Sequence, residues 1–487
     1  MRVAFVHHHF RPGGVTRVIS GQASALRGSA SVLLVSGEPP QKPPGIPHVV
    51  VPSLAYDRDR RERKSAPEIA NDILCSVQGV WKNGADLYHF HNPTLGKNTN
   101  LLSVIKQLHD RKQTLLLQIH DFAEDGRPWG YTREEYPADC HYAVINKRDY
   151  RILLDAGLNK EGLHYIPNTV YPLPHGGIKK QKQKEHKEAA RETDVVLYPV
   201  RAIRRKNIGE AVLLSRFLER GKKIGITLEP TGPVDVMSYR MWMNFVKEKK
   251  LPVLFGLGVR NDFESLLERT SCMITTSIKE GFGLSFLEPW TGGKMLYGRL
   301  LRDICSDFME RGVDLGHLYE EIRVPLSLME VDHFHRLWVR CYTERLNQYG
   351  LTDSTEDAEV HFQRIIQNET ADFGMLDETL QMNLIGALWS DGEAEKKILD
   401  VNPILADTFL FTQSPSLVSR NKGIIEREYS WRRTKTTLSR VYEQVLGHPV
   451  FQSVNKGALL QAFNKPEKSF LLLCESACGE AAARVRT

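Results

Sequence analysis

Long apolar segments are absent from this sequence of 487 residues. No uninterrupted apolar run approaches the roughly 18 residues that a membrane-spanning helix needs. We therefore expect no transmembrane segment, although this leaves peripheral membrane contact open. The chain begins with Met-Arg and continues directly into a short strand-like run. That beginning lacks the pattern of a secretory signal, so we expect a cytoplasmic protein.

Cysteine is scarce and irregularly placed. The seven cysteines are an odd number without a repeated spacing, which argues against a disulfide framework and favours free thiols in a reducing compartment. Cys474 and Cys478 stand close enough in sequence to form half of a metal site, but no second pair accompanies them. We therefore predict no bound metal.

Charge of one sign is not concentrated anywhere in the chain. The 65 basic residues are nearly balanced by 59 acidic ones, which leaves a formal net charge of +6. Nucleic-acid binders usually gather their cations on one face or carry a known module. Neither feature is present, so we expect no nucleic-acid partner. The mildly basic balance suits a ligand that carries phosphate.

Strands alternate with helices in two tandem regions. Short apolar runs lie at residues 2–6, 31–35, 87–91, 114–119 and 142–145, with helix-like stretches such as 103–108 between them. A second series lies at 195–198, 224–227, 253–255 and 272–275. This alternation predicts parallel sheets that are covered by helices on both faces. The predicted fold class is α/β, with two Rossmann-like, doubly wound domains.

The segments between and after these regions suggest the domain boundaries. A basic stretch at 173–193 is typical of a charged linker, so the first domain spans residues 1–172 and the second spans 194–423. The chain turns helical and irregular after about residue 295, which predicts a long helical insertion at about 300–420. The last segment, 424–487, contains apolar residues at helical spacing: Leu438, Val441, Val445 and Leu446.

The segment from Glu280 to Glu288 carries the strongest chemical pattern. It follows the predicted strand at 272–275, so Gly281 and Gly283 occupy a strand-to-helix turn where the backbone can approach a ligand closely. A helix expected from about Leu284 would add its N-terminal partial charge. The Glu288 carboxylate can accept two hydrogen bonds from a vicinal diol such as ribose. A glycine turn that only caps a helix is the alternative.

Cations follow the predicted strand at 195–198. Arg201 and Lys206 stand at the carboxyl end of a parallel strand, where open α/β sheets bind ligands. Fixed cations there can bind a diphosphate and stabilise its charge as it leaves, without a metal ion. A solvated basic turn is the alternative.

Two weaker patterns lie in the first region. Gly13 and Gly14 precede a predicted helix, whose N-terminus can bind an anion. His120 ends the strand at 114–119 and can bind a sugar hydroxyl, although a lone histidine is more often structural.

Together these segments resemble the retaining glycosyltransferases of family 4, which adopt the GT-B fold. The resemblance covers about residues 1–295 and the helix near 424–446. Glu280 and Glu288 are its most specific part, and Arg201 and Lys206 match the paired cations of that family. It implies two domains that face a cleft, and a segment 424–487 that crosses back to the N-terminal domain.

The resemblance also implies the reaction and the residues that perform it. The enzyme would transfer a hexose from a UDP- or GDP-linked sugar with retention of configuration, and it would need no metal ion or cofactor. The catalytic residues would be His120, Arg201, Lys206 and Glu280. The donor would be bound by Gly13, Gly14, Arg201, Lys206, Gly232, Phe255, Gly281, Phe282, Gly283, Leu284 and Glu288.

The acceptor is predicted to be small and anionic, such as a sugar phosphate or a hydroxy acid. The guanidinium fork of arginine matches the paired oxygens of phosphate and carboxylate. Cations that only balance the donor diphosphate are the alternative. A lipid acceptor would favour an amphipathic basic helix, which residues 1–172 lack. The candidate acceptor residues are His9, Arg11, Arg17, Lys97 and Arg127.

Two further motifs have residue types that can bind a metal, but we do not expect either to form a metal site. Asp57-Arg58-Asp59 has the form used by metal-dependent glycosyltransferases of another fold, but it lies in a charged run without a preceding strand. The triplet His7-His8-His9 cannot easily meet one ion, because adjacent residues of an extended chain point in opposite directions.

Two other functions remain open at this point. A nucleotide-sugar epimerase or phosphorylase can use the same fold, and so can a non-catalytic protein that binds a sugar nucleotide. The combination of Arg201 and Lys206 with Glu288 favours transfer.

Overall fold

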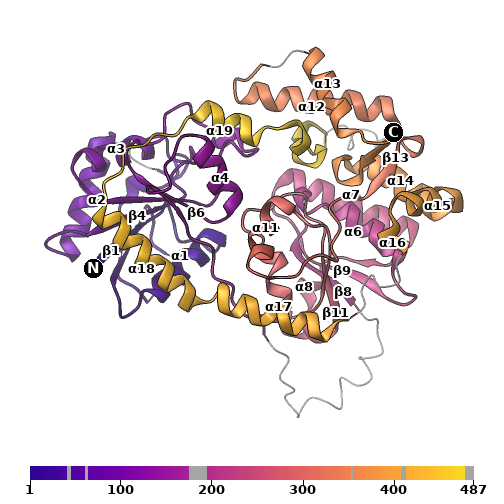
Figure 1. Cartoon of the computed structure of the whole chain (residues 1–487), viewed down its shortest axis with the longest axis horizontal. Coiled ribbons are helices and arrows are strands. Elements are labelled where there is room, and N and C mark those ends of the chain that lie inside the picture. Colours follow the sequence, from indigo (N-terminus) through magenta and orange to yellow (C-terminus); the bar gives the residue numbers. More distant parts are fainter. Residues whose placement is uncertain (41–44, 61–63, 175–194, 353–354, 407–412, 478–487) are drawn as a thin grey trace, which may run out of the picture. The chain divides into compact units, whose positions relative to one another are not determined.

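A computed structural model describes residues 1–40, 45–60, 64–174, 195–352, 355–406 and 413–477 (Figure 1). The chain forms two compact units. Unit 1 contains residues 1–170 and 427–464, and unit 2 contains the described residues of 171–426 together with the segment that begins at 465. Most of the predicted linker, at 175–193, lies outside the described residues.

Unit 1 is built on a seven-stranded parallel sheet with the strand order β3-β2-β1-β4-β5-β6-β7. The order reverses between β1 and β4, and open α/β sheets bind ligands beyond the carboxyl ends of the strands at such a reversal. The strands are β1 (Arg2–Val6), β2 (Ser31–Ser36), β3 (His48–Val50), β4 (Leu87–His91), β5 (Leu115–Ile119), β6 (His141–Val144) and β7 (Leu163–Tyr165).

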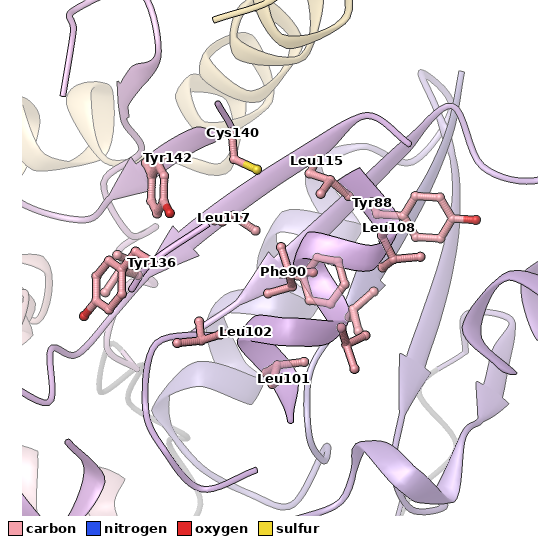
Figure 2. Packing of buried hydrophobic residues seen from close by; sticks show 14 of the residues in the cluster. Tyr88, Phe90, Leu101, Leu102, Leu108, Leu115, Leu117, Tyr136, Cys140 and Tyr142 are labelled. Atoms are coloured by element: carbon pink, nitrogen blue, oxygen red, sulfur yellow. The ribbon is translucent and has the colours of Figure 1, made fainter. Parts of the chain in front are cut away.

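Alternate residues of these strands enter two separate cores, one on each face of the sheet. Ala4 and Val6 belong to the core beneath one layer of helices, whereas Val3 and Phe5 belong to the core on the opposite face. Figure 2 shows the first core, where Phe90 and other strand residues pack with leucines of α3. The first layer holds α2 (Ala66–Val80), α3 (Leu101–Asp110), α4 (Lys147–Asp155) and α19 (Lys456–Phe463), and the second holds α1 (Gly14–Ala25) and α18 (Trp431–Gly447).

The late helix α18 packs in unit 1 although it follows unit 2 in the sequence. Leu438 and Tyr442 are buried with Phe5 in the second core, and α18 lies beside α1 (Figure 1). Burying a side chain such as leucine contributes about 1.5–3 kcal/mol, so these contacts hold the helix on the sheet.

The segment after residue 464 differs from the predicted return to the first domain, because its described residues belong to unit 2. Lys468 pairs with Asp303 at 2.5 Å, and Arg204 donates a hydrogen bond of 2.6 Å to the carbonyl oxygen of Cys474. These polar contacts hold the segment on unit 2.

Unit 2 is built on a five-stranded parallel sheet with the order β10-β9-β8-β11-β12. Its order reverses between β8 and β11. The strands are β8 (Val195–Arg201), β9 (Lys223–Leu228), β10 (Val253–Leu254), β11 (Thr270–Thr275) and β12 (Leu296–Gly298). The helices between them are α6 (Ile208–Leu214), α7 (Pro233–Lys249), α8 (Leu257–Arg260) and α9 (Phe263–Glu268).

The predicted helical insertion is confirmed, and it packs directly on the sheet's own helices. Its helix α14 (Glu378–Ser390) contacts α6 and α7. Gly209 of α6 permits this approach, because a Cβ there would collide with Trp242 of α7 and Gln381 of α14. The insertion also contains α11 (Arg302–Glu310), α12 (Val331–Gln348), α13 (Thr355–Ile365), α15 (Gly392–Val401), α16 (Pro403–Ala406), α17 (Pro415–Glu428) and the antiparallel pair β13 (Arg323–Pro325) and β14 (Thr370–Asp372).

None of the helices in the described ranges combines the length and the apolar character needed to cross a bilayer.

Candidate functional site

The two central strands of unit 2 bring the predicted cation loop and the predicted glycine turn together. The loop after β8 contains the short 3-10 helix η3 (Arg204–Lys206). The hydroxyl of Tyr198 in β8 donates to the carbonyl oxygen of Lys206 at 2.8 Å. Thr276, which follows β11, donates to the same oxygen at 3.0 Å. These hydrogen bonds fix the cation loop against the end of β11.

An ion cluster joins the loop to Glu280. Lys206 Nζ donates to one carboxylate oxygen of Glu280. Arg205 Nη1 donates to the other oxygen at 3.1 Å and to the carbonyl oxygen of Lys279 at 2.7 Å. Burial alone would raise the pKa of Glu280, but the charges of Lys206 and Arg205 outweigh that effect and lower it to about 2. Glu280 is therefore a carboxylate held between two cations.

Sequence reasoning did not select Arg205. The only signal for it was its place between Arg204 and Lys206 in one basic run, and the run does not show which of the three guanidinium or ammonium groups reaches Glu280. The structure turns Arg204 inward to Glu378 of α14, with bonds of 2.6 and 2.9 Å, and leaves Arg205 beside Glu280.

The glycine turn after Glu280 is sterically demanding. Gly283 has φ = 88°, a left-handed conformation, and a Cβ there would lie 2.9 Å from Ile304 and 3.0 Å from Phe286. Glycine is therefore required at this position. Phe282 is buried and packs edge-to-face on Phe308, with ring centroids 5.6 Å apart. Its side chain belongs to the core, which leaves its backbone as the part that a ligand could contact.

The helix expected from about Leu284 is not a regular helix. The chain forms a 3-10 turn, η5 (Leu284–Phe286), and then the four-residue helix α10 (Glu288–Thr291). Leu287 adopts φ = −116° between them and interrupts the hydrogen-bond ladder. The prediction of a regular helix from about Leu284 is therefore wrong, and a helix this short has little aligned dipole. Glu288 is half-buried at the first position of α10.

The remaining donor candidates of unit 2 lie at the same sheet edge with separate partners. Arg201 ends β8, is exposed, and donates to the carbonyl oxygen of Glu229 at 2.8 Å. Gly232 immediately precedes α7. Phe255 follows β10 and packs edge-to-face on Tyr239, with ring centroids 5.3 Å apart.

Histidines occupy the carboxyl edge of the sheet in unit 1. His120 follows β5, and its Nε2 shares a hydrogen bond of 3.0 Å with Nδ1 of His91 at the end of β4. His7, which follows β1, hydrogen-bonds through Nδ1 to the carbonyl oxygen of His91 at 2.8 Å. Burial lowers the pKa of His120 to about 4 and that of His89 to about 3. These rings are therefore neutral at physiological pH, which suits contact with uncharged hydroxyl groups.

Asn92 fixes the turn that carries His120, and it was also missed from sequence. Its side-chain oxygen accepts hydrogen bonds from the backbone N–H groups of His120, at 3.1 Å, and Asp121, at 3.0 Å. Asn92 itself has φ = 56°, a conformation that asparagine tolerates better than most residues. The sequence did indicate that Asn92 directly follows a strand, at the edge of the sheet where ligands bind.

Gly13 and Gly14 stand at the N-terminus of the twelve-residue helix α1. No side chain caps this end, and its first turn contains no acidic residue. The N–H groups of a first helical turn lack partners within the helix, so they can bind an anion. A Cβ on Gly14 would meet nothing within 4 Å, which shows that the surrounding protein does not require glycine there.

Two of the predicted acceptor cations, Arg11 and Arg127, already have carboxylate partners. Arg11 forms a forked pair with Glu38, at 2.6 and 2.5 Å, and contacts Asp59 at 3.1 Å. Arg127 pairs with Asp121 at 2.6 Å. Arg17 is exposed on α1, and His9 Nε2 shares a hydrogen bond of 2.9 Å with the hydroxyl of Tyr56.

Lys97 differs from these cations. Its ammonium lies 4.9 Å from the ring centroid of Tyr56 and 5.6 Å from that of Trp129, and it donates a long hydrogen bond of 3.4 Å to the hydroxyl of Tyr56. Burial lowers its pKa. No carboxylate among the described residues comes within ion-pair distance of it, so this charge is available to an anionic ligand.

The two motifs that suggest a metal have other partners. Asp57 pairs with Arg60, and Asp59 pairs with Arg11. His7, His8 and His9 bind three separate groups: the carbonyl oxygens of His91 and Leu54, and the hydroxyl of Tyr56.

Comparisons with known proteins bear on the fold. No protein-family model matches the chain. It is 25% identical over 481 residues to mannosylglucosyl-3-phosphoglycerate synthase of Petrotoga mobilis, with 90% of each chain covered. Its structure is similar to that of HepE from Anabaena, solved with UDP and glucose, at a TM-score of 0.51 and 13% identity over 91% of this chain and 99% of that one. Its structure is also similar to that of a glycosyltransferase from Rickettsia africae, at a TM-score of 0.52 and 10% identity over 92% of this chain and 99% of that one.

The chain has the GT-B fold. Two Rossmann-like units with parallel sheets and a helical insertion in the C-terminal half match the predicted fold class, which is confirmed. The candidate site of unit 2 comprises the cation loop and the glycine turn. Unit 1 carries a separate candidate site, the histidines at the carboxyl edge of its own sheet.

Proposed function

We propose that this protein is a glycosyltransferase that moves a hexose from a UDP- or GDP-linked sugar to a small anionic acceptor. The observation that carries the proposal is the cluster of Arg205, Lys206 and Glu280 at the switch point of the unit 2 sheet. The similarity to a sugar-phosphoglycerate synthase and to a structure that holds UDP and glucose supports it.

The donor diphosphate would bind at the cation loop. Lys206 and Arg205 now share their charge with Glu280, and a diphosphate would compete for the same donors. Arg201 at the end of β8 would add a further cation. Within unit 1, the first turn of α1 with Gly13 and Gly14 offers N–H donors to an anionic group of the donor. Negative charge grows on the diphosphate as the sugar leaves, and preorganised cations stabilise it without a metal ion. Glu288 and Gly232 would meet the nucleoside, with Phe255 beside them.

The sugar would be held by neutral groups. In unit 2, the turn from Gly281 to Leu284 presents its backbone beside the Glu280 carboxylate. In unit 1, His120 offers an uncharged imidazole to a hydroxyl group. Because that carboxylate is tied to two cations, it is a poor general base for an inverting attack. We therefore propose retention of the anomeric configuration, as in the family 4 enzymes that the sequence resembles.

The acceptor would be recognised through Lys97. Among the cations predicted for this role, Lys97 is half-buried between two aromatic rings and has no carboxylate partner in the described part of the chain. Arg11 is the weakest candidate, because two carboxylates already neutralise it. A phosphate or carboxylate on the acceptor would pair with this ammonium.

The test is release of nucleoside diphosphate from UDP- and GDP-linked hexoses, with and without acceptors. The acceptor panel contains neutral sugars, sugar phosphates, phosphoglycerate, hydroxy acids and lipid-linked sugars. Release that depends on an anionic acceptor supports transfer. An epimerised donor, a sugar phosphate formed with inorganic phosphate, or donor binding without turnover would each refute it.

Proton NMR of the first-formed product tests retention. A product whose new linkage has the donor's anomeric configuration supports the assignment of Glu280 to the donor side. An inverted linkage would overturn it.

A further inference from the structure

Two thiols and a carboxylate meet in unit 2, apart from the cation loop. Cys341 and Glu344 belong to α12, and Cys474 follows the 3-10 turn η9 (Leu471–Leu473). The two sulfur atoms and one carboxylate oxygen all lie within 4.8 Å of one another. Residues three apart on a helix share a face, so α12 presents Cys341 and Glu344 side by side to the segment that carries Cys474.

Polar groups surround this cluster, because Ser476 and Arg340 both contact Glu344. Ser476 donates to Glu344 at 2.6 Å, and its hydroxyl oxygen lies 3.0 Å from the sulfur of Cys474 and 3.8 Å from that of Cys341. Cys341 is buried, whereas Cys474 is half-buried and Glu344 reaches solvent. A buried cysteine usually packs as a small hydrophobic residue, but here both sulfurs lie beside one carboxylate that an ion could reach.

We propose that Cys341, Glu344 and Cys474 bind one zinc ion. Zinc binds thiolate sulfur at about 2.3 Å and carboxylate oxygen at about 2.0–2.2 Å in a tetrahedral arrangement, which places its ligand atoms roughly 3.5–4 Å apart. Three atoms within 4.8 Å need only small side-chain rotations to reach that geometry. Magnesium and calcium prefer oxygen ligands alone, so the two sulfurs select a softer ion. A water molecule can complete the fourth position.

Thiol ligands must lose their protons before they bind a metal, so zinc binding at Cys341 and Cys474 would release protons.

The site is connected to the donor loop by one buried residue. The carbonyl oxygen of Cys474 accepts a hydrogen bond of 2.6 Å from Arg204 Nη1, and Arg204 directly precedes Arg205 and Lys206. The same guanidinium pairs with Glu378. An ion at Cys474 would thus fix the segment that supports Arg204. This role is structural and does not place a metal in the proposed transfer reaction.

Metal analysis of the full chain tests the site. The untagged protein would be purified under reducing conditions from cells grown with zinc, and its metal content measured by mass spectrometry. We expect about one zinc ion per chain. Cys341→Ser and Cys474→Ser should each reduce it to background, whereas Cys75→Ser, which removes an exposed thiol in unit 1, should leave it unchanged.

A further variant, Glu344→Gln, distinguishes loss of the zinc ligand from misfolding of the chain. Glu344 reaches solvent, so Glu344→Gln should fold normally and weaken zinc binding by more than about tenfold, since replacing even an outer-shell partner costs about 10–100-fold in affinity. Added zinc should raise the unfolding temperature of the metal-stripped wild type, because a ligand that binds only the folded state stabilises it. It should not do so in the two serine variants.

Three results would overturn the proposal. They are an absence of zinc with no thermal stabilisation by added zinc, retention of zinc in both serine variants, and a disulfide between Cys341 and Cys474 in the reduced preparation. All of these measurements are made without donor or acceptor, so they are independent of the proposed transferase activity.

Discussion

The carboxyl edges of the two sheets have the same topology but opposite chemistry. In unit 1, the residues that follow β1 and β5 and the residue that ends β4 are histidines whose pKa values burial lowers, so they are neutral. In unit 2, the residues that follow β8 and β11 are charged and paired, as in the cluster of Arg205, Lys206 and Glu280. Parallel sheets place a ligand at such an edge in both cases, but the side chains decide which ligand is suitable.

This difference suggests that the two units bind different parts of the substrates. Neutral imidazoles can hydrogen-bond hydroxyl groups without attracting a diphosphate, whereas fixed cations attract one strongly. The two units should also be destabilised by different changes. The ion pairs of unit 2 depend on both partners being present, whereas the histidines of unit 1 depend on remaining unprotonated. The following predictions test the comparison, from the largest expected effect to the smallest.

Breaking the buried pair behind the cation loop should affect unit 2 most. Glu378→Gln leaves the Arg204 guanidinium buried without its carboxylate, which should lower the free energy of unfolding of unit 2 by about 3–5 kcal/mol. Hydrogen exchange measured peptide by peptide would locate the loss. Glu321→Gln, which breaks a partly exposed pair with Arg323, should cost less than about 1 kcal/mol. Equal losses in the two variants would contradict this account.

Removing the central cation should abolish most turnover. Lys206→Ala takes away a preorganised donor to the leaving diphosphate, and we expect a rate lower by about 10²–10³, or roughly 3–4 kcal/mol. Steady-state kinetics with saturating donor would measure it. The control is Lys249→Ala, an exposed lysine at the end of α7, which should keep its rate. If the Lys206 variant turned over normally, the diphosphate would bind elsewhere.

Acid should unfold unit 1 through its histidines. A histidine with a pKa of 6.5 when unfolded and about 4 when folded, such as His8 or His120, binds more protons in the unfolded state. Each such histidine stabilises the folded state fully above pH 6.5. As the pH falls to about 4, the free energy of unfolding decreases by about 3 kcal/mol for each of them. Exchange rates of unit 1 amides between pH 7 and 4 would show the loss.

A single substitution can reduce this acid sensitivity. His8→Asn keeps a donor for the carbonyl oxygen of Leu54 but cannot titrate, so unit 1 should lose about 3 kcal/mol less over the same pH range. Gln444→Asn changes an exposed residue of the same unit that does not titrate, and it should not alter the profile. Identical profiles for wild type and His8→Asn would show that other groups cause the acid unfolding.

Lys97 differs from the neutral histidines of unit 1 in carrying a charge, and its removal should affect the acceptor alone. Hydrogen bonds to charged groups contribute about 1.5–3 kcal/mol, so Lys97→Met should raise the KM for an anionic acceptor by about 10–100-fold, with the KM for the donor unchanged. Lys106→Met, which removes a surface lysine paired with Glu134, is the matched control. An unchanged acceptor KM would reassign Lys97 to a structural role.

The smallest expected effect is that of divalent ions on turnover. With cations supplied by Lys206 and Arg205, brief treatment with EDTA should leave the rate unchanged, and added Mg²⁺ or Mn²⁺ should not increase it. Metal content would be measured in the same samples, so that loss of zinc from the Cys341 site is not mistaken for loss of a catalytic ion. Activity lost in EDTA and restored by Mg²⁺ would contradict the metal-independent mechanism.

Much of the fold could be predicted because it depends on local patterns. The strands at residues 2–6, 87–91 and 195–198 were predicted since buried parallel strands are continuous apolar runs. The late helix was predicted from the 3.6-residue spacing of its apolar face. The three-residue strands β3, β7 and β12 were not predicted, because so few residues show no period and form only by pairing with a neighbouring strand.

The sequence by itself determined which residues stand at the ends of the strands, and with them the candidates Glu280, Lys206 and His120. Only the tertiary structure decided how these residues are paired. Arg204 and Arg205 are adjacent and chemically alike, yet one is buried against Glu378 and the other lies beside Glu280. Cys341 and Cys474 meet across more than a hundred residues of intervening chain. No local pattern encodes such contacts, because an ion pair or a thiol pair depends on which elements pack together, and that depends on the burial of the whole core.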